Sequence, residues 1–143
     1  MTVDAFVLDA SVTLSWAFED ETNPYSEKVL QSLSSMLAFV PAIWLLEVSN
    51  ALLVAQRRGR IGSSTADRFV HLIQQLPVSV VNDTMQKVFG TVLTAARQYG
   101  LSAHDAAYLC LALELGLPLA TRDEALPHAG LRSGVPLLWH EER

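Results

Sequence analysis

The sequence predicts an α/β fold, a three-layer α/β/α sandwich with a short, mainly parallel central sheet. Stretches typical of helices alternate along the chain with short strand-like runs. These runs are apolar and lack the polar–apolar alternation of a strand with one wet face, so helices should cover both faces of the sheet. The chain has no repeat, linker or low-complexity segment, and its 143 residues suit one domain, which we expect to span residues 1–143.

Short apolar runs predict the strands of this sheet. Residues 5–9 form an apolar run that ends in an acid, and its length suits a buried strand. Further runs predict three more strands and a possible last one. They lie at residues 37–40, 78–81, 117–120 and 135–139.

The segments between the runs carry the start and stop signals of helices. Ser11 could cap the first helix, and Pro24 suits a first helical position after the acidic loop 19–24. Ser102 begins a helix that Gly116 closes. Helices are expected at residues 12–18, 24–35, 43–58, 63–76, 84–98, 102–115 and 124–129.

Composition excludes several classes of protein. The chain is 50% hydrophobic and 17% charged, which excludes a disordered or collagen-like protein. Its single cysteine, Cys110, excludes an internal disulfide and fits a reducing compartment. The longest apolar run, residues 36–46, contains Pro41 and is too short to span a membrane. The N-terminus lacks the basic start of a signal peptide, so we expect a cytoplasmic protein without a membrane partner.

A mean hydropathy of +0.26 is high for a soluble monomer. It indicates that a partner or a second copy of the chain covers some apolar surface.

The placement of the acids is more informative than the net charge of −5, which is unusual for a nucleic-acid binder. Asp9, Glu47 and Asp105 stand among apolar neighbours in stretches without lysine or arginine. A carboxylate buried in such a stretch must be paired, protonated or bound to a metal ion, and oxygen ligands favour Mg²⁺ or Mn²⁺. Setting these three and Asp123 aside from the 15 acids leaves 11 acidic side chains against 10 basic ones. The sequence thus predicts a near-neutral body with an acidic pocket.

The predicted topology brings these acids to one edge of the sheet, where ligands of such folds bind. Asp9 ends the first strand, and Thr121 and Asp123 follow the fourth. Asp105 sits in the first turn of the helix that leads into the fourth strand, and Glu47 lies one turn into the helix after the second. Converging carboxylates repel one another unless divalent ions bridge them. Such a site suits phosphodiester hydrolysis by metal-activated water, with Thr121 orienting an acid or a water.

Four strings of the sequence resemble PIN-domain proteins and, more narrowly, VapC-type toxins of toxin–antitoxin pairs. They occur in the family's order over almost the whole chain. The strings are VLDASVTLSWAFED, VPAIWLLEVSNALLVAQRRGRI, YGLSAHDAAYLCLALELGLPLATRDEAL and GVPLL.

The resemblance implies a Mg²⁺- or Mn²⁺-dependent endoribonuclease that acts as a homodimer. It also implies inhibition by a small VapB-type antitoxin, which binds DNA and plugs the site. His104 departs from the aromatic residue that many relatives carry at this place. The family's four acids, its Ser or Thr before the last acid and its polar residue after the first acid match as Asp9, Glu47, Asp105, Asp123, Thr121 and Ser11.

Structural roles remain open for each acid. Asp105 completes a Ser-x-x-Asp capping pattern that starts at Ser102, and Asp9 could cap the next helix. Asp123 could be a solvated turn or cap residue, whereas Glu47 has few such uses in its apolar helix.

Further polar residues are candidates for supporting roles. Asn50 shares a helix face with Glu47 and could hold it. Arg57, Arg58 and Arg60 could grip RNA phosphates beside the acidic pocket, or they could form a solvated helix end. His104 could contact RNA, or it could be an ordinary surface histidine.

Three functions remain open. The first is an RNA-cleaving toxin. The second is a phosphatase with an aspartyl nucleophile, which usually wants an acid where Ser11 stands and a well-placed lysine, although only Lys28 and Lys87 exist. The third is a non-catalytic PIN-fold module that binds RNA or protein, against which the complete acid set argues.

Overall fold

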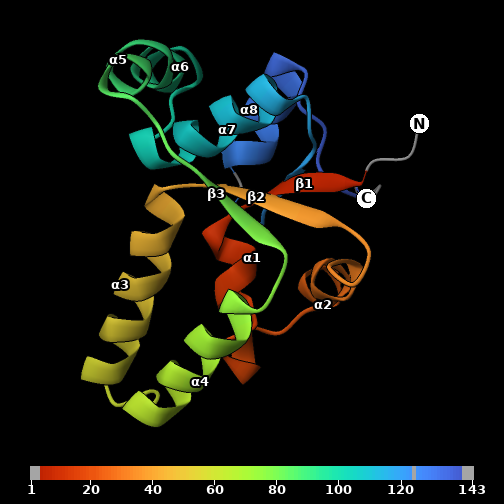
Figure 1. Ribbon diagram of the computed structural model, residues 1–143. Coiled ribbons are helices and arrows are strands. Elements are labelled where there is room, and N and C mark those ends of the chain that lie inside the picture. The colour runs from red at the N-terminus through yellow and green to blue at the C-terminus, as the bar shows by residue number, and fades with distance from the viewer. Residues whose placement is uncertain (1–3, 124, 140–143) are drawn as a thin grey trace.

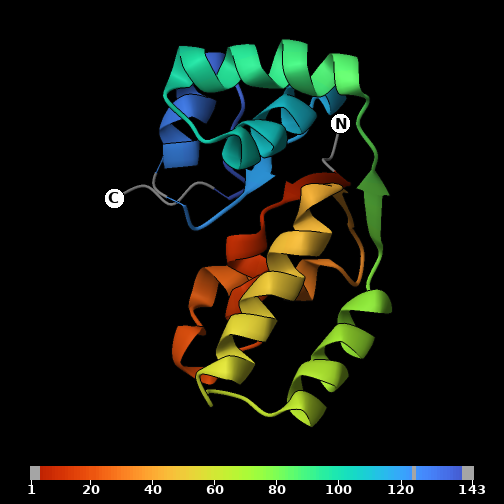
Figure 2. The same ribbon diagram turned by 90° about the vertical axis from the view of Figure 1, so that its left-hand side faces the viewer.

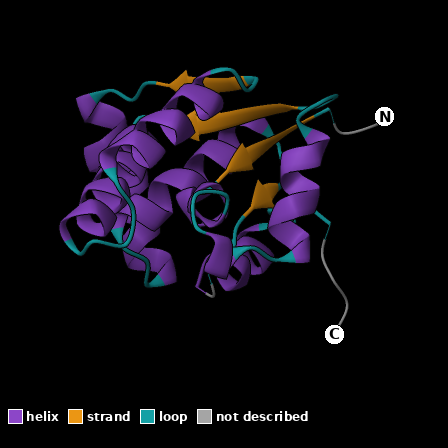
Figure 3. Ribbon diagram, turned by 90° about the horizontal axis from the view of Figure 1, so that it is seen from below, coloured by secondary structure: helices purple, strands orange, loops and turns teal. Residues whose placement is uncertain are grey.

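A parallel sheet forms the centre of the protein (Figures 1 and 3). The computed structural model describes residues 4–123 and 125–139, and within them four strands pair in the order β3-β2-β1-β4. All three pairings are parallel. The strands are β1 (Ala5–Leu8), β2 (Leu37–Pro41), β3 (Val78–Val81) and β4 (Leu119–Ala120).

Helices cover both faces of this sheet, which confirms the predicted three-layer α/β/α class (Figures 1 and 2). One face carries α1 (Ala10–Ser15), α2 (Pro24–Ser32), α3 (Ile43–Arg57) and α4 (Ser63–Gln74). The other face carries α5 (Met85–Lys87), α6 (Leu93–Tyr99), α7 (Ala103–Leu115) and α8 (Ala125–Ser133). A short 3₁₀ turn, η1 (Glu19–Glu21), precedes α2.

The burial of the strands follows from this layering. Phe6, Val7 and Leu8 of β1 are fully buried, as expected for a central strand with apolar side chains on both faces. The edge strand β3 is the least buried of the four described strands, because its Ser79 and Val80 are exposed and its other two residues are half-buried. Trp44 of α3 donates its indole N–H to the Thr13 hydroxyl of α1 at 3.0 Å, which ties two helices of one layer together.

Several helix boundaries form as the sequence predicts. Asn23 accepts the Ser26 amide and Pro24 takes the first helical position of α2. Thr84 and Ser102 cap α5 and α7 in the same way. Gly116 ends α7 in the left-handed conformation, with a φ of 65°.

The first and fifth predicted helices differ from the structure. Helix α1 begins at Ala10, with Asp9 at its N-cap position, and Ser11 does not cap it because its hydroxyl binds the Asp9 carboxylate. The helix expected over 84–98 is interrupted by a π-helical turn, η2 (Val88–Val92). Gly90, a weak helix former, lies within this turn.

The C-terminal strands are shorter than predicted. Strand β4 comprises only Leu119–Ala120, and a single parallel bridge, Leu119 to Leu137, replaces the possible last strand over 135–139. Pro118 and Pro136 explain the difference, since proline has no N–H to give to a sheet ladder. The last helix extends to Ser133, and residue 124, its predicted first residue, lies outside the described part of the chain.

Among the described helices, none is both long enough and apolar enough to cross a membrane.

Candidate active site

The candidate site lies where the strand order reverses. After β1 the chain adds β2 and β3 on one side, and it returns to add β4 on the other side of β1. The carboxyl ends of β1 and β4 therefore lie at the switch point, the place at which parallel α/β sheets bind ligands. Asp9 follows β1, and its amide donates to the Ala120 carbonyl at 2.9 Å, which brings Thr121 alongside it.

Asp9 is buried and bound by two hydroxyl groups. Only 5% of its surface is exposed. Ser11 Oγ and Thr121 Oγ1 donate to the same carboxylate oxygen, Oδ2, at 2.6 and 2.7 Å. Burial raises the pKa of Asp9, the two hydroxyls oppose the rise, and the charges of Glu47 and Asp123 add to it.

Ser11 also connects the two strand ends. Its Oγ accepts the Arg122 amide at 2.9 Å and lies 3.4 Å from Thr121 Oγ1. Ser11 and Thr121, two of the three predicted supporting residues, thus hold Asp9 and the segment after β4 in one hydrogen-bonded group.

Asp105 lies in the first turn of α7 and interacts with the other acids. Its amide donates to Ser102 Oγ at 3.1 Å, so the capping pattern is present. The pKa of the Asp105 carboxyl is raised to about 6, first by burial and then by the negative charges of Asp123, Asp9 and Glu47. The cap and the acidic cluster therefore coexist at this residue.

Asp123 anchors the start of α8. Its Oδ1 accepts the amides of Ala125 at 2.7 Å and Leu126 at 3.3 Å, and its own amide donates to Thr121 Oγ1 at 3.0 Å. The structural alternative for Asp123, a cap, is thus present, and it fixes the carboxylate beside the other acids.

Glu47 of α3 meets a residue that the sequence analysis did not select. The Tyr108 hydroxyl of α7 donates to Glu47 Oε1 at 2.6 Å. The one sequence signal for this contact was the position of Tyr108, one turn after Asp105 on the same helix face.

In the described part of the chain, no hydrogen bond or ion pair joins the remaining candidate residues to the four acids. Asn50 is exposed, and no hydrogen bond joins it to Glu47 in the described structure. His104 is exposed in the first turn of α7. Arg57 and Arg58 are exposed at the far end of α3, about 15 Å along the helix axis from Glu47.

Arg60 is engaged within the chain. It pairs with Asp20 at 2.6 Å and Glu21 at 2.8 Å, and its guanidinium lies 4.1 Å from the Phe18 ring centre. Arg122 was not selected from the sequence. It lies between Thr121 and Asp123 and donates to the Glu21 carbonyl at 3.1 Å. Its proximity to Asp123 in the sequence was the available signal.

The lysines do not serve this site. Lys28 lies over the Trp139 ring, 4.5 Å from its centre. Lys87 pairs with Asp83 and Glu114. An aspartyl-nucleophile phosphatase therefore lacks its lysine here.

The donor set fits a divalent cation in its chemistry. Within the described residues, none of the four acids forms a salt bridge, and burial and mutual repulsion raise the pKa of Asp9 and Asp105. Carboxylates in this state favour an oxygen-preferring cation such as Mg²⁺, which also retains several water ligands. In the same part of the chain, no three His, Cys, Asp or Glu side chains already form a close ligand group.

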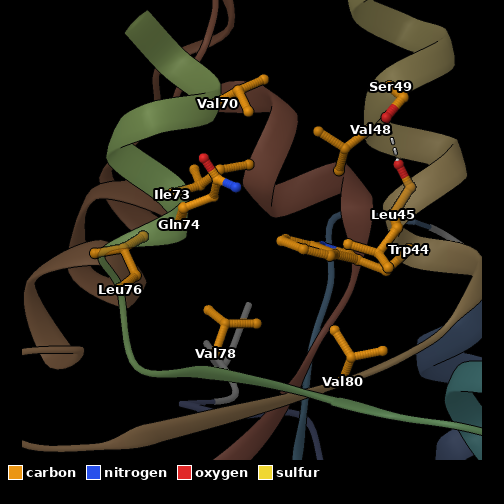
Figure 4. Close-up of a pocket in the computed structure, with 10 residues that line it drawn as sticks. All are labelled: Trp44, Leu45, Val48, Ser49, Val70, Ile73, Gln74, Leu76, Val78 and Val80. Carbon is orange, nitrogen blue, oxygen red and sulfur yellow. Dashed lines mark hydrogen bonds between the residues drawn. The ribbon is translucent and has the colours of Figure 1, made fainter. Parts of the chain in front are cut away.

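A separate apolar pocket lies between α3, α4 and β3 (Figure 4). Its volume is about 350 Å³, and none of its lining residues is charged. The lining residues are Trp44, Leu45, Val48, Ser49, Val70, Ile73, Gln74, Leu76, Val78 and Val80.

A family model for the PIN domain matches residues 6–131. The chain belongs to the PIN-domain family. This match includes all four acids of the candidate site, so the PIN domain contains the whole acidic cluster. No curated protein matches the chain.

Solved structures share this PIN fold. The crystal structure of PAE2754 from Pyrobaculum aerophilum has a TM-score of 0.67 at 26% identity, covering 90% of this chain and 87% of that one. FitAcB from Neisseria gonorrhoeae has a TM-score of 0.65 at 16% identity, covering 95% and 99%. VapBC2 from Rickettsia felis, bound to a DNA fragment from its promoter, has a TM-score of 0.63 at 12% identity, covering 94% and 97%. The last two likenesses show the fold alone.

Proposed function

We propose that this PIN domain, taken to span residues 1–143, is a metal-dependent endoribonuclease and the toxin of a VapBC-like type II toxin–antitoxin pair. One observation carries the proposal. Asp9, Glu47, Asp105 and Asp123 interact at the carboxyl edge of the sheet, and no described lysine or arginine pairs with them. Hydrolysis of phosphodiester bonds is the chemistry that this charge arrangement suits best. Membership of the PIN-domain family supports a nuclease, and RNA is the substrate that we propose.

The four carboxylates would hold Mg²⁺ or Mn²⁺. Bound there, the ion would lower the pKa of water and stabilise negative charge on the phosphoryl oxygens. The chain's own contribution is to fix the carboxylates. Ser11 and Thr121 hold one oxygen of Asp9, and the first amides of α8 hold one oxygen of Asp123.

A VapB-type antitoxin and a second copy of this chain are the proposed protein partners. One structural neighbour is a toxin–antitoxin complex from Klebsiella pneumoniae, with a TM-score of 0.58 at 15% identity, covering 82% of this chain and 86% of that one. The VapBC2 neighbour supports the same assignment. We propose that toxin and antitoxin act in the cytoplasm, and fractionation of cells that express the tagged chain would locate it.

A cleavage assay tests the proposal. The chelator-treated protein should leave end-labelled single-stranded RNA intact, and added Mg²⁺ or Mn²⁺ should restore cleavage to defined internal fragments. Asp9→Asn should remain inactive at every metal concentration, while Asp67→Asn, an exposed acid on α4, should cut normally. Cleavage that persists in excess chelator, or full activity in Asp9→Asn, would contradict the proposal.

A non-catalytic PIN-fold module that binds RNA or protein is the second candidate. The absence of a close ligand group among the described acids favours it. Calorimetric titration with Mn²⁺ separates the two candidates, because only the nuclease requires an ion at the acidic edge. Binding that Asp9→Asn and Asp105→Asn both weaken supports the nuclease, and no heat at millimolar Mn²⁺ supports the module.

A further inference from the structure

Tyr108 connects the two helical layers at the acidic edge. It belongs to α7, on one face of the sheet, and its partner Glu47 belongs to α3, on the other face (Figures 1 and 2). The hydroxyl donates to Glu47 Oε1 at 2.6 Å across 61 residues of sequence. Tyr108 is fully buried, so packing fixes the position from which it donates.

This hydrogen bond holds the Glu47 carboxylate in place. In the described part of the structure, neither carboxylate oxygen of Glu47 has another hydrogen bond or an ion pair. Glu47 is itself only half-buried, so packing alone leaves its carboxylate in reach of solvent. Without Tyr108, the carboxylate would be free to rotate into solvent.

A phenol suits this task better than a basic side chain. The Tyr108 hydroxyl is a phenol, which is uncharged near pH 7 because an ordinary tyrosine has a pKa of about 10. The group therefore remains a neutral donor. It orients Glu47 and leaves the negative charge of the carboxylate available to a cation. A guanidinium in its place would neutralise that charge.

We infer that Tyr108 is a positioning residue of the acidic site, which holds the Glu47 carboxylate where a divalent ion can use it. The inference rests on the proposed metal-dependent function. Partners of this kind orient metal ligands, and their removal costs about 10–100-fold in metal affinity or activity.

Calorimetric titration with Mn²⁺ tests the inference. Tyr108→Phe removes only the hydroxyl and should weaken Mn²⁺ binding by about 10–100-fold. Tyr99→Phe makes the same change on α6, outside the acidic site, and should bind as the unaltered protein does. Thermal unfolding of each variant checks that the fold is kept.

A double-variant cycle shows whether Tyr108 acts through Glu47. On a Glu47→Ala background, Tyr108→Phe should cause no further loss of Mn²⁺ affinity. A purely structural role would instead produce the same loss on both backgrounds. If Tyr108→Phe alone does not fold, the double variant removes both partners of the hydrogen bond, and its comparison with Glu47→Ala decides the question.

The outcomes separate this inference from the proposed function. If the unaltered protein binds Mn²⁺ and Tyr108→Phe binds it equally well, the inference is wrong and the nuclease proposal stands. If the unaltered protein neither binds Mn²⁺ nor cleaves RNA, both are wrong. A weaker double variant than Glu47→Ala also overturns the inference.

Discussion

Asp9 is a buried carboxylate held by two neutral hydroxyl groups rather than by a cation. Hydroxyl donors fix the orientation of the group but leave its charge uncompensated, and burial penalises that charge. These contacts suit a carboxylate that binds a cation better than one that forms a structural ion pair.

Asp9→Asn should abolish RNA cleavage and leave the protein folded. The amide retains an acceptor for Ser11 and Thr121 but loses the charge that attracts a metal ion. Since the loss of a mere supporting contact costs about 10–100-fold, loss of a ligand should cost more than about 100-fold. A gel assay with labelled RNA measures the rate, and the melting temperature should not fall.

The pH dependence of stability should reveal Asp105. Its pKa is raised from 3.8 to about 6 on folding, so the folded state holds this proton more tightly than the unfolded state. The resulting stability is present below about pH 4 and is lost as the pH rises through 6. We therefore compare the free energies of unfolding of Asp105→Asn and of the unaltered, metal-free protein. The difference should shift in favour of the variant by about 1 kcal/mol as the pH rises from 4.5 to 7.5, allowing for solvent screening.

Thermal or urea unfolding at the two pH values provides the measurement. A difference between the two proteins that does not change with pH would show that the acids do not interact as proposed. Mn²⁺ affinity should also rise as the pH passes 6, because the proton and the ion compete for the same carboxylate.

The sequence points to the acids as candidates but does not show their contacts with other residues. Apolar neighbours and missing basic residues point to Asp9, Glu47 and Asp105 because these are local properties. The Tyr108–Glu47 contact joins residues of two layers and depends on how the helices pack, which no local pattern shows. The distance of Arg57 and Arg58 from the acids likewise depends on the length and direction of α3.

At the scale of elements, α8 meets the segment that follows it closely. A Cβ added at Gly130 would lie 2.8 Å from the Val135 carbonyl oxygen, which is backbone and cannot move aside cheaply. The Val135 amide donates to the Gly130 carbonyl at 2.8 Å. This hydrogen bond holds the segment after α8 against the helix.

Gly130→Ala should therefore destabilise the protein by about 1–3 kcal/mol. Gly90→Ala is the matched control, because an added Cβ in the η2 turn meets nothing within 4 Å and its φ is not positive. It should be neutral or stabilise by up to about 1 kcal/mol. Chemical denaturation gives both values, and a Gly130 variant as stable as the Gly90 variant would contradict the packing described here.

Strand and helix positions were largely predictable, and their exact ends were not. Residues Val78–Val81 form β3 as expected because apolar residues there are flanked by turn signals. Strand β4 and the last predicted strand, 135–139, are shorter in the structure than the sequence predicts. Pro118 and Pro136 have no N–H to donate to the sheet. Helix α1 begins before the predicted residue 12 because Ser11 does not cap it. The Ser11 hydroxyl binds the Asp9 carboxylate and the Arg122 amide instead.

At the scale of the whole molecule, several large apolar side chains face solvent. Met85 and Phe89, one turn apart, are 76% and 68% exposed, and Leu46 is 67% exposed. Soluble monomers seldom expose many such residues together, which agrees with the high mean hydropathy of the sequence.

We therefore predict a homodimer in solution. Light scattering coupled to size exclusion should give twice the 15.7 kDa mass of the chain at micromolar concentration. A clean monomer under these conditions would contradict the prediction. The proposed antitoxin would then be the partner that covers the apolar surface.

Anomalous diffraction from a crystal soaked in MnCl₂ tests the central proposal most directly, because it locates the ion itself. The proposal predicts a peak at the carboxyl ends of β1 and β4, within coordination distance of carboxylate oxygens of Asp9, Glu47, Asp105 and Asp123. A fully soaked crystal with no peak there, or with manganese only at unrelated surface acids, would contradict it.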